Sequence, residues 1–222
     1  MAKLTDMHRT IAAPLTWFPR LLQAAPEERA TDVAKGLVIF AHGSGSGRLS
    51  PRNNYVARCL REAGLATLLL DLLTPEEEAD RRNVFDIALL ASRLRLAADW
   101  AARHPETARL RRCYFGASTG GGAALRAAAH DPRIAAVVSR GGRPDLAGAD
   151  ALVRVTAPTL LIVGELDGVV IELNAIAIDA MHCERDMVII PGAGHLFEEP
   201  GTLDQVVELT QNWLLRHLGA QP

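Results

Sequence analysis

The sequence predicts an α/β fold, with a mostly parallel central sheet and helices on both of its faces. Short runs rich in leucine and β-branched residues alternate along the chain with longer segments of helical period. The short runs are nearly uninterrupted apolar stretches, as expected of strands that are covered on both faces. The chain of 222 residues has the length of a single domain, and its 49% hydrophobic and 23% charged residues are ordinary for a globular protein.

The expected elements follow one another in a regular order. Strands are predicted at residues 36–41, 66–70, 112–115, 134–139, 159–163 and 187–190. Helices are predicted from a Ser50 cap and Pro51 to Gly64, over 83–104, from Ser118 onward, over 171–182 and over 203–218. We therefore expect one domain over 1–222, made of a catalytic core over 35–219 and an irregular N-terminal segment over 1–34. That segment contains three prolines and has no clean period.

Charge and cysteine usage exclude several classes of function. The net charge of -2 and the pI near 6.4 do not favour a nucleic-acid or membrane-surface partner, because both prefer a basic face. Cys59, Cys113 and Cys183 are far apart and odd in number, which indicates reduced thiols rather than a disulfide framework. The N-terminus lacks the apolar core of a signal peptide, and no apolar run is long enough to span a membrane. A cytoplasmic protein is expected.

A glycine-rich loop follows the first predicted strand and raises the question of nucleotide binding. Gly43, Gly45 and Gly47 alternate there, and Asp71 ends the next strand, where a dinucleotide-binding fold would place a ribose ligand. The third glycine comes one position too early for G-x-G-x-x-G, and the helix begins only at Ser50. The nucleotide interpretation is therefore disfavoured, and no cofactor is expected. No cluster of histidines and acids has the spacing of a metal site, so no metal is expected either.

A nucleophile is predicted at Ser118. The residues 116–120 read G-A-S-T-G, between an apolar strand end and a glycine-rich helix start. A serine at such a strand-to-helix turn is held in a strained conformation with its hydroxyl exposed. The small residues on both sides are needed because the turn is crowded by neighbouring backbone. The plainer interpretation is a helix cap surrounded by glycines that allow helix–strand contact.

His195 is the best candidate for the base. It lies in a glycine-rich loop after the last predicted strand and before the last helix, and five of the other histidines lie in helices, at helix ends or in the N-terminal segment. The sixth, His42, is expected to shape the loop after the first strand. For the acid that orients His195 we prefer Asp167, which lies in a turn after a strand, over Asp145 and Glu165. The chain order Ser118, Asp167, His195 is that of the α/β-hydrolases.

Six segments together resemble an α/β-hydrolase of the dienelactone-hydrolase-like group, over residues 36–218. They are FAHGSGSGRLSPRN, TLLLDLLTPEEEADRRNVFDI, YFGASTGGGAAL, VVSRGGRPDLAG, APTLLIVGELDGVVIELN and IIPGAGHLFEEPG. The resemblance implies an α/β-hydrolase fold without a large cap domain and a triad of Ser118, Asp167 and His195. It also implies an oxyanion hole made by the backbone N–H groups of Ser44 and Thr119. Well-known dienelactone hydrolases carry a cysteine where this chain has Ser118, and this departure speaks against dienelactone itself as the substrate.

The function expected from these features is that of a serine esterase or lactonase acting on a small soluble ester or lactone through an acyl-enzyme. A non-catalytic scaffold that binds a small ligand or partner stays open, as does hydrolysis of an amide or carbon–carbon bond. Arg48, Arg140 and Arg143 follow strand ends and are candidates for binding an anionic group of the substrate, or for bracing loops by pairing with acids. Residues 75–83 are expected to be an acidic helix entry rather than a mobile lid. A monomer or homodimer is expected.

Overall fold

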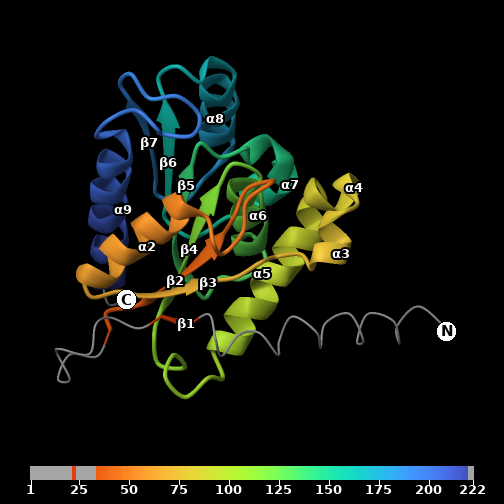
Figure 1. Cartoon of the computed structure of the whole chain (residues 1–222), viewed down its shortest axis with the longest axis vertical. Coiled ribbons are helices and arrows are strands. Elements are labelled where there is room, and N and C mark those ends of the chain that lie inside the picture. Colours follow the sequence, from red (N-terminus) through yellow and green to blue (C-terminus); the bar gives the residue numbers. More distant parts are fainter. Residues whose placement is uncertain (1–21, 24–33, 220–222) are drawn as a thin grey trace.

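The computed structural model describes residues 22–23 and 34–219, and these form one sheet with helices on both sides (Figure 1). The strand order is β1-β3-β2-β4-β5-β6-β7. The six strands β2 to β7 all run parallel to one another, which confirms the predicted fold class. Their bounds are Leu37–Ala41, Ala66–Leu69, Arg112–Ala117, Ile134–Arg140, Thr159–Gly164 and Arg185–Ile190.

The strand β1, Leu22–Gln23, adds an edge that the sequence analysis did not predict. It pairs antiparallel with β3, with Leu22 opposite Leu68 and Gln23 opposite Thr67. Two residues are too short for any alternation of apolar and polar side chains, so periodicity could not have found this strand. Most of the segment 1–34, which was expected to be irregular, lies outside the described residues.

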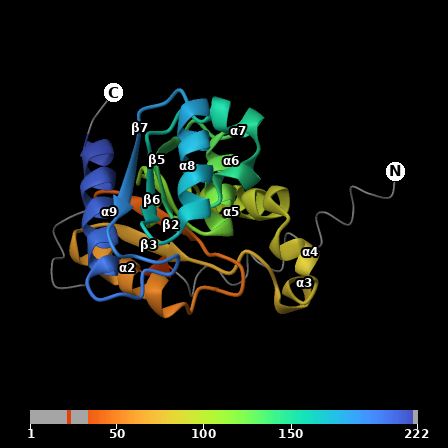
Figure 2. The same cartoon turned by 90° about the horizontal axis from the view of Figure 1, so that it is seen from above.

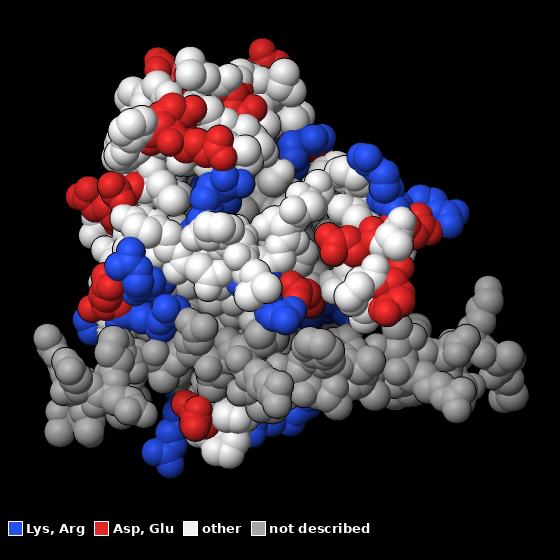
Figure 3. Space-filling view, viewed as in Figure 1, with Lys and Arg blue, Asp and Glu red and all other residues white. Residues whose placement is uncertain are grey.

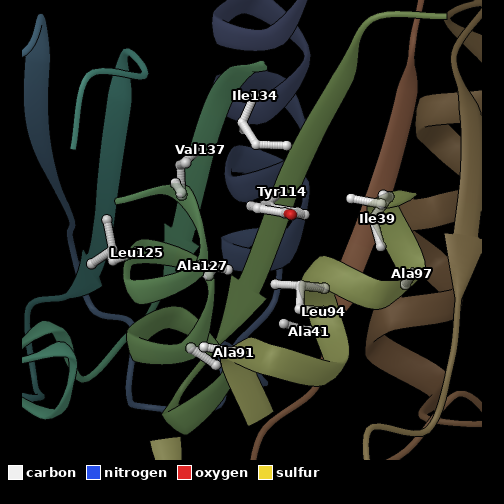
Figure 4. Close-up of a cluster of buried hydrophobic side chains, with 14 of the residues drawn as sticks. Ile39, Ala41, Ala91, Leu94, Ala97, Tyr114, Leu125, Ala127, Ile134 and Val137 are labelled. Atoms are coloured by element: carbon white, nitrogen blue, oxygen red, sulfur yellow. The ribbon is translucent and has the colours of Figure 1, made fainter. Parts of the chain in front are cut away.

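The helices cover the two faces of the sheet in separate groups (Figure 2). On one face lie α2, Pro51–Glu62, and α9, Thr202–Gly219; on the other lie α5, Ile87–Ala101, α6, Thr119–Ala128, and α8, Gly168–Ala180. Each face buries its own cluster of apolar side chains. In the larger one Tyr114 of β4 is fully buried beside α5 and α6 (Figure 4). The sheet is covered on both sides, as the apolar strands had indicated.

The predicted helix 83–104 is wrong in its extent, because the helical region begins earlier, at Pro75, and is divided into three helices. These are α3, Pro75–Glu78, α4, Arg81–Val84, and α5. Thr74 and Glu77 form a reciprocal capping box, so a helix begins at Pro75. The side chain of Asp86 then accepts a hydrogen bond from the N–H of Leu89 and starts α5 anew. Residues 75–83 are thus mostly helical, at the side of α5 (Figure 1).

Two short helices lie between β5 and β6, where the sequence analysis had placed none. They are η2, Pro144–Ala147, and α7, Ala149–Arg154. Within the described part of the chain, no helix is both long and apolar enough to cross a membrane. On the face drawn in Figure 3, Lys and Arg side chains are interspersed with Asp and Glu side chains rather than gathered in one area.

Candidate active site

Ser118 occupies a sharp turn between β4 and α6. Its backbone φ is 51° and its ψ is -121°, a conformation that non-glycine residues rarely adopt. The strain is held by hydrogen bonds, since the Ser118 N–H donates to the carbonyl of Arg140 and the Ser118 carbonyl accepts from the N–H of Arg143. The side chain is half-buried. Strain fixed in this way by the surroundings is typical of a functional site.

The glycines around Ser118 are explained by contacts with backbone. A Cβ on Gly116 would lie 2.4 Å from the carbonyl oxygen of Gly120, and one on Gly120 would lie 2.1 Å from the carbonyl oxygen of Ala41. A Cβ on Gly121 would lie 2.8 Å from the Cα of Gly142. These distances are shorter than any non-bonded contact allows. The turn therefore requires glycine at these positions. This agrees with the crowding that was predicted from the sequence.

His195 and Asp167 reach Ser118 from two other loops at the same edge of the sheet. The Nε2 atom of His195 lies 3.2 Å from the Oγ of Ser118, and its Nδ1 lies 2.5 Å from the Oδ2 of Asp167. An ionised carboxylate only accepts hydrogen bonds, so Nδ1 carries the proton and Nε2 is left to accept from the serine hydroxyl. The structure thus brings together the three side chains that the sequence analysis selected, in hydrogen-bonded order.

The two competing acids have other partners. Both carboxylate oxygens of Asp145 accept from the guanidinium of Arg143, at 2.8 and 2.7 Å. The carboxylate of Glu165 accepts from the N–H of Gly192 at 2.7 Å, which ties the β6–α8 turn to the loop that carries His195. Neither carboxylate makes a hydrogen bond or ion pair with His195, so the geometry favours Asp167 as the partner of His195.

The glycine-rich loop after β2 lies directly beside Ser118. A Cβ placed on Gly43 would be 3.0 Å from the Cβ of Ser118. His42 holds this loop, because its Nε2 accepts from the N–H of Leu72 at 2.9 Å while its Nδ1 lies 3.0 Å from the Gly43 carbonyl. His42 therefore shapes the loop, as expected. Because Gly43 lies against Ser118, the loop brings the backbone of the next residue, Ser44, near the nucleophile.

The carboxylate of Asp71 is engaged by the glycine-rich loop itself. It accepts from the backbone N–H of Arg48 at 2.7 Å and is ion-paired with the Arg48 guanidinium. Gly47 is required here as well, since a Cβ on it would lie 2.6 Å from an Asp71 carboxylate oxygen. This pairing removes the acid on which the nucleotide interpretation depended.

The three candidate arginines differ in their surroundings. Arg48 is paired with Asp71, and Arg143 is paired with Asp145. Both pairs brace loops, which is the second of the two roles that the sequence suggested for these arginines. Arg140 is 7% exposed, and its recorded side-chain hydrogen bond is a long one, 3.4 Å from Nη2 to the Oδ1 of Asn53. Among the described residues, no group of three or more histidines, cysteines and acids has the arrangement of a metal site.

Comparison with known proteins agrees with this architecture. No family model matches the chain. A crystal structure of a dienelactone hydrolase from Anabaena variabilis is 58% identical and superposes with a TM-score of 0.81, covering 83% of this chain and 87% of that one. The structure of Est1E from Butyrivibrio proteoclasticus is 18% identical, with a TM-score of 0.74 over 90% of this chain and 93% of its own, a likeness of fold alone.

Two curated relatives come from strains of Mycobacterium tuberculosis and carry a provisional name, phosphoribosyl transferase. They are 62% identical over 186 residues, which is 83% of this chain and 42% of each relative. The chain thus spans about two fifths of the length of these proteins.

The parallel sheet, the strained serine turn and the structural relatives define an α/β-hydrolase. Within that superfamily, the chain belongs to the dienelactone-hydrolase-like family.

Proposed function

We propose that this protein is a carboxylic-ester hydrolase, an esterase or lactonase, with Ser118 as nucleophile, His195 as general base and acid, and Asp167 as the residue that orients His195. The observation that carries the proposal is the continuous set of hydrogen bonds from Ser118 through His195 to Asp167. A scaffold without catalytic activity would have no need for a strained serine aligned on a histidine.

The reaction follows from these positions. Ser118 Oγ attacks the acyl carbonyl while its proton passes to His195 Nε2, and the protonated ring then returns the proton to the leaving alcohol. The acyl-enzyme ester is cleaved by water, which His195 deprotonates in the same way. Asp167 holds the ring and stabilises its charged form throughout. An amide or carbon–carbon bond would use the same residues, and the choice of an ester rests on the family.

We assign the oxyanion hole to the backbone N–H groups of Thr119 and Ser44. Thr119 is the first residue of α6, and the loop of Ser44 lies against Ser118. Two such donors face the oxygen on which charge develops in the tetrahedral intermediate, and each is worth about 2.7–4 kcal/mol in comparable enzymes.

The rim of the site favours a substrate with an apolar part. Leu166 directly precedes Asp167 and is 69% exposed, and Val169, two residues after Asp167, is 71% exposed. Leu196, which follows His195, is 43% exposed. The N–H of Leu166 donates to the carbonyl of Ala193, so these two loops lie together. Exposed apolar side chains gathered near reactive groups are typical of a surface that contacts a ligand.

The transferase name of the longer relatives calls for a separate interpretation. Transfer of a phosphoribosyl group needs sites for a diphosphate and for the ribose hydroxyls, and Asp71, the acid beside the glycine-rich loop after β2, is already paired with Arg48. We infer that this name refers to the part of those proteins that the present chain does not match.

A fluorophosphonate probe tests the proposed function. The wild-type protein should be labelled covalently and should hydrolyse short para-nitrophenyl esters. Ser118→Ala should abolish labelling and lower kcat by about 10⁴-fold or more. Ser92→Ala, an exposed serine of α5, is the matched control and should behave as wild type. Undiminished labelling of the Ser118 variant, or an unlabelled and inactive wild type, would refute the proposal.

A further inference from the structure

Phe197, two residues after His195, has a backbone conformation that its side chain disfavours. Its φ is 55°, and Ser118 is the one other non-glycine residue with a positive φ in the described parts of the chain. The loop between β7 and α9 also reaches positive φ at Gly192 and Gly201, with values of 68° and 78°. Both of these are glycines, the residue that adopts this conformation without strain. A bulky residue at the third such position therefore indicates that its side chain is needed there.

The Phe197 side chain anchors this loop. The residue is 2% exposed, and its ring belongs to the apolar cluster on the face of the sheet covered by α2 and α9. Its backbone N–H donates to the carbonyl of Gly194 at 3.2 Å. This bond closes a four-residue turn in which His195 and Leu196 occupy the two central positions. The buried ring thus fixes one end of the turn that carries the proposed base.

The other end of the turn is fixed against the end of β6. The N–H of Leu166 donates to the carbonyl of Ala193 at 2.9 Å. A Cβ on Gly164 would lie 2.4 Å from the carbonyl oxygen of Ala193, so the two backbones are in close contact. Close-packed backbone of this kind has no room to shift toward the sheet. With this end fixed, the packing of Phe197 at the other end determines how far the turn of His195 is able to rotate.

The turn of His195 rests on Gly141. A Cβ on Gly141 would lie 3.2 Å from the carbonyl oxygen of His195 and 3.6 Å from the Cε1 atom of its imidazole. The same Cβ would lie 3.4 Å from the Cε2 atom of Phe197. Both rings therefore approach one glycine, whose own N–H donates to the carbonyl of Ile162 at 2.7 Å. The packing of the Phe197 ring on Gly141 and the position of the imidazole are thus linked.

The hydrogen bond between Ser118 and His195 leaves little tolerance for movement of the imidazole. The Oγ and Nε2 atoms are 3.2 Å apart, near the upper end of the range for a hydrogen bond. An outward shift of the imidazole by about 0.5 Å would break this bond, and active-site groups have to be held within about that distance. Ser118 is fixed by the hydrogen bonds of its own backbone, so the imidazole is the partner that is able to move.

We propose that Phe197 is a positioning residue for His195. Its ring, packed between the apolar cluster and Gly141, holds the turn so that Nε2 of His195 stays within reach of the Ser118 hydroxyl. The strained φ of Phe197 results from keeping a large side chain at a position where the backbone reverses direction. The inference rests on the proposed hydrolase function, because it assigns a role within the same reaction.

Substitutions at residue 197 separate this role from core packing alone. Phe197→Ala should lower kcat on a short para-nitrophenyl ester by about 10²-fold and change KM by less than about threefold, because only the alignment of the base is lost. Leu214→Ala is the matched control, since this side chain of α9 is fully buried in the same cluster. It should be destabilised to a similar extent and should keep the wild-type kcat when both variants are assayed well below their melting temperatures.

Phe197→Gly gives a second comparison, in which stability and activity are expected to change in opposite directions. Glycine removes the ring as alanine does, but it relieves the strain at this φ. We therefore expect Phe197→Gly to melt at a higher temperature than Phe197→Ala and to be at least as slow. A kcat that rises together with the melting temperature in this pair would show that Phe197 acts through stability alone, and it would overturn the inference.

An NMR measurement separates the inference from the proposed chemistry. The proton that His195 Nδ1 donates to Asp167 should give a low-field signal, because the two heavy atoms are 2.5 Å apart, and the signal is assigned by its loss in His195→Gln. In Phe197→Ala it should broaden, because an imidazole that is no longer held exchanges this proton with water. Leu214→Ala should leave it unchanged. This pattern in a protein that hydrolyses no ester would uphold the role of Phe197 and refute the hydrolase function.

Two further outcomes would overturn the inference: a kcat of Phe197→Ala within about threefold of that of Leu214→Ala, or an Nδ1 proton signal that is the same in both variants. If Phe197→Ala does not fold, Phe197→Leu takes its place, because leucine keeps much of the apolar contact. It should lower kcat several-fold with little change in KM, and an unchanged kcat in that variant would likewise overturn the inference.

Discussion

Replacing Arg140 with methionine should stabilise the protein, because its buried guanidinium has no acid to pair with. The lowering of the Arg140 pKa from its ordinary value to about 10 means that its surroundings disfavour the charged form by about 3 kcal/mol. Since the folded-state pKa is the lower one, this cost is fully present below about pH 10 and fades only as the pH rises from there toward the ordinary pKa of arginine. Methionine keeps the apolar stem of the side chain and removes the charge.

The expected gain in stability is the cost of burying the charge, which the substitution removes, less the contribution of the long hydrogen bond between Arg140 and Asn53. We expect the free energy of unfolding at neutral pH to rise by about 1–3 kcal/mol, with about 2–4 °C in Tm for each kcal/mol. Urea unfolding followed by circular dichroism measures it, and an unchanged m-value shows that the unfolded state is the same. Arg143→Met, which breaks a partly exposed pair, is the control and should stay within about 0.5 kcal/mol. A loss of more than about 1 kcal/mol in Arg140→Met, in buffer free of multivalent anions, would refute this reasoning.

Two further predictions concern the acid and the serine turn. Asp167→Asn should lower kcat on a short ester by about 10³–10⁴-fold, because the ring of the histidine loses its orientation, whereas Asp145→Asn should change it only a few-fold. The reverse ranking in steady-state kinetics would exchange their roles. Gly120→Ala should prevent folding or cost about 3 kcal/mol or more, since its Cβ would meet backbone. Gly168→Ala, whose Cβ meets open space, should be neutral or stabilising by about 0.4–1 kcal/mol in the same unfolding assay.

Most of the sheet could be predicted from the sequence because its strands are apolar on both faces and are separated by helices of clear period. The residues of the candidate site could be selected because each lies in the turn or loop that follows a strand. In a parallel sheet the carboxyl ends of the strands meet at one edge. Ser118, Asp167 and His195 therefore lie together even though 77 residues separate the first from the last.

The partners of the arginines could not be predicted in the same way. Arg48, Arg140 and Arg143 all follow strand ends, and sequence position does not distinguish them. What separates them is the direction of each side chain: Arg48 and Arg143 turn toward acids, and Arg140 turns under α2. The helix boundaries near Asp86 were equally undetermined, because several nearby residues are able to cap a helix and the apolar stripe continues past the break.

The glycine contacts around Ser118 also have a consequence for how this scaffold tolerates change. Gly116, Gly120 and Gly121 each face backbone that cannot move aside, so this part of the protein offers almost no allowed substitutions. New specificity, whether selected in nature or in a library, has to come from exposed positions in the loops at the carboxyl edge, such as Leu166, Val169 and Leu196. A library confined to those loops would retain folded members, whereas one that includes the serine turn would lose most of its variants before any activity could be measured.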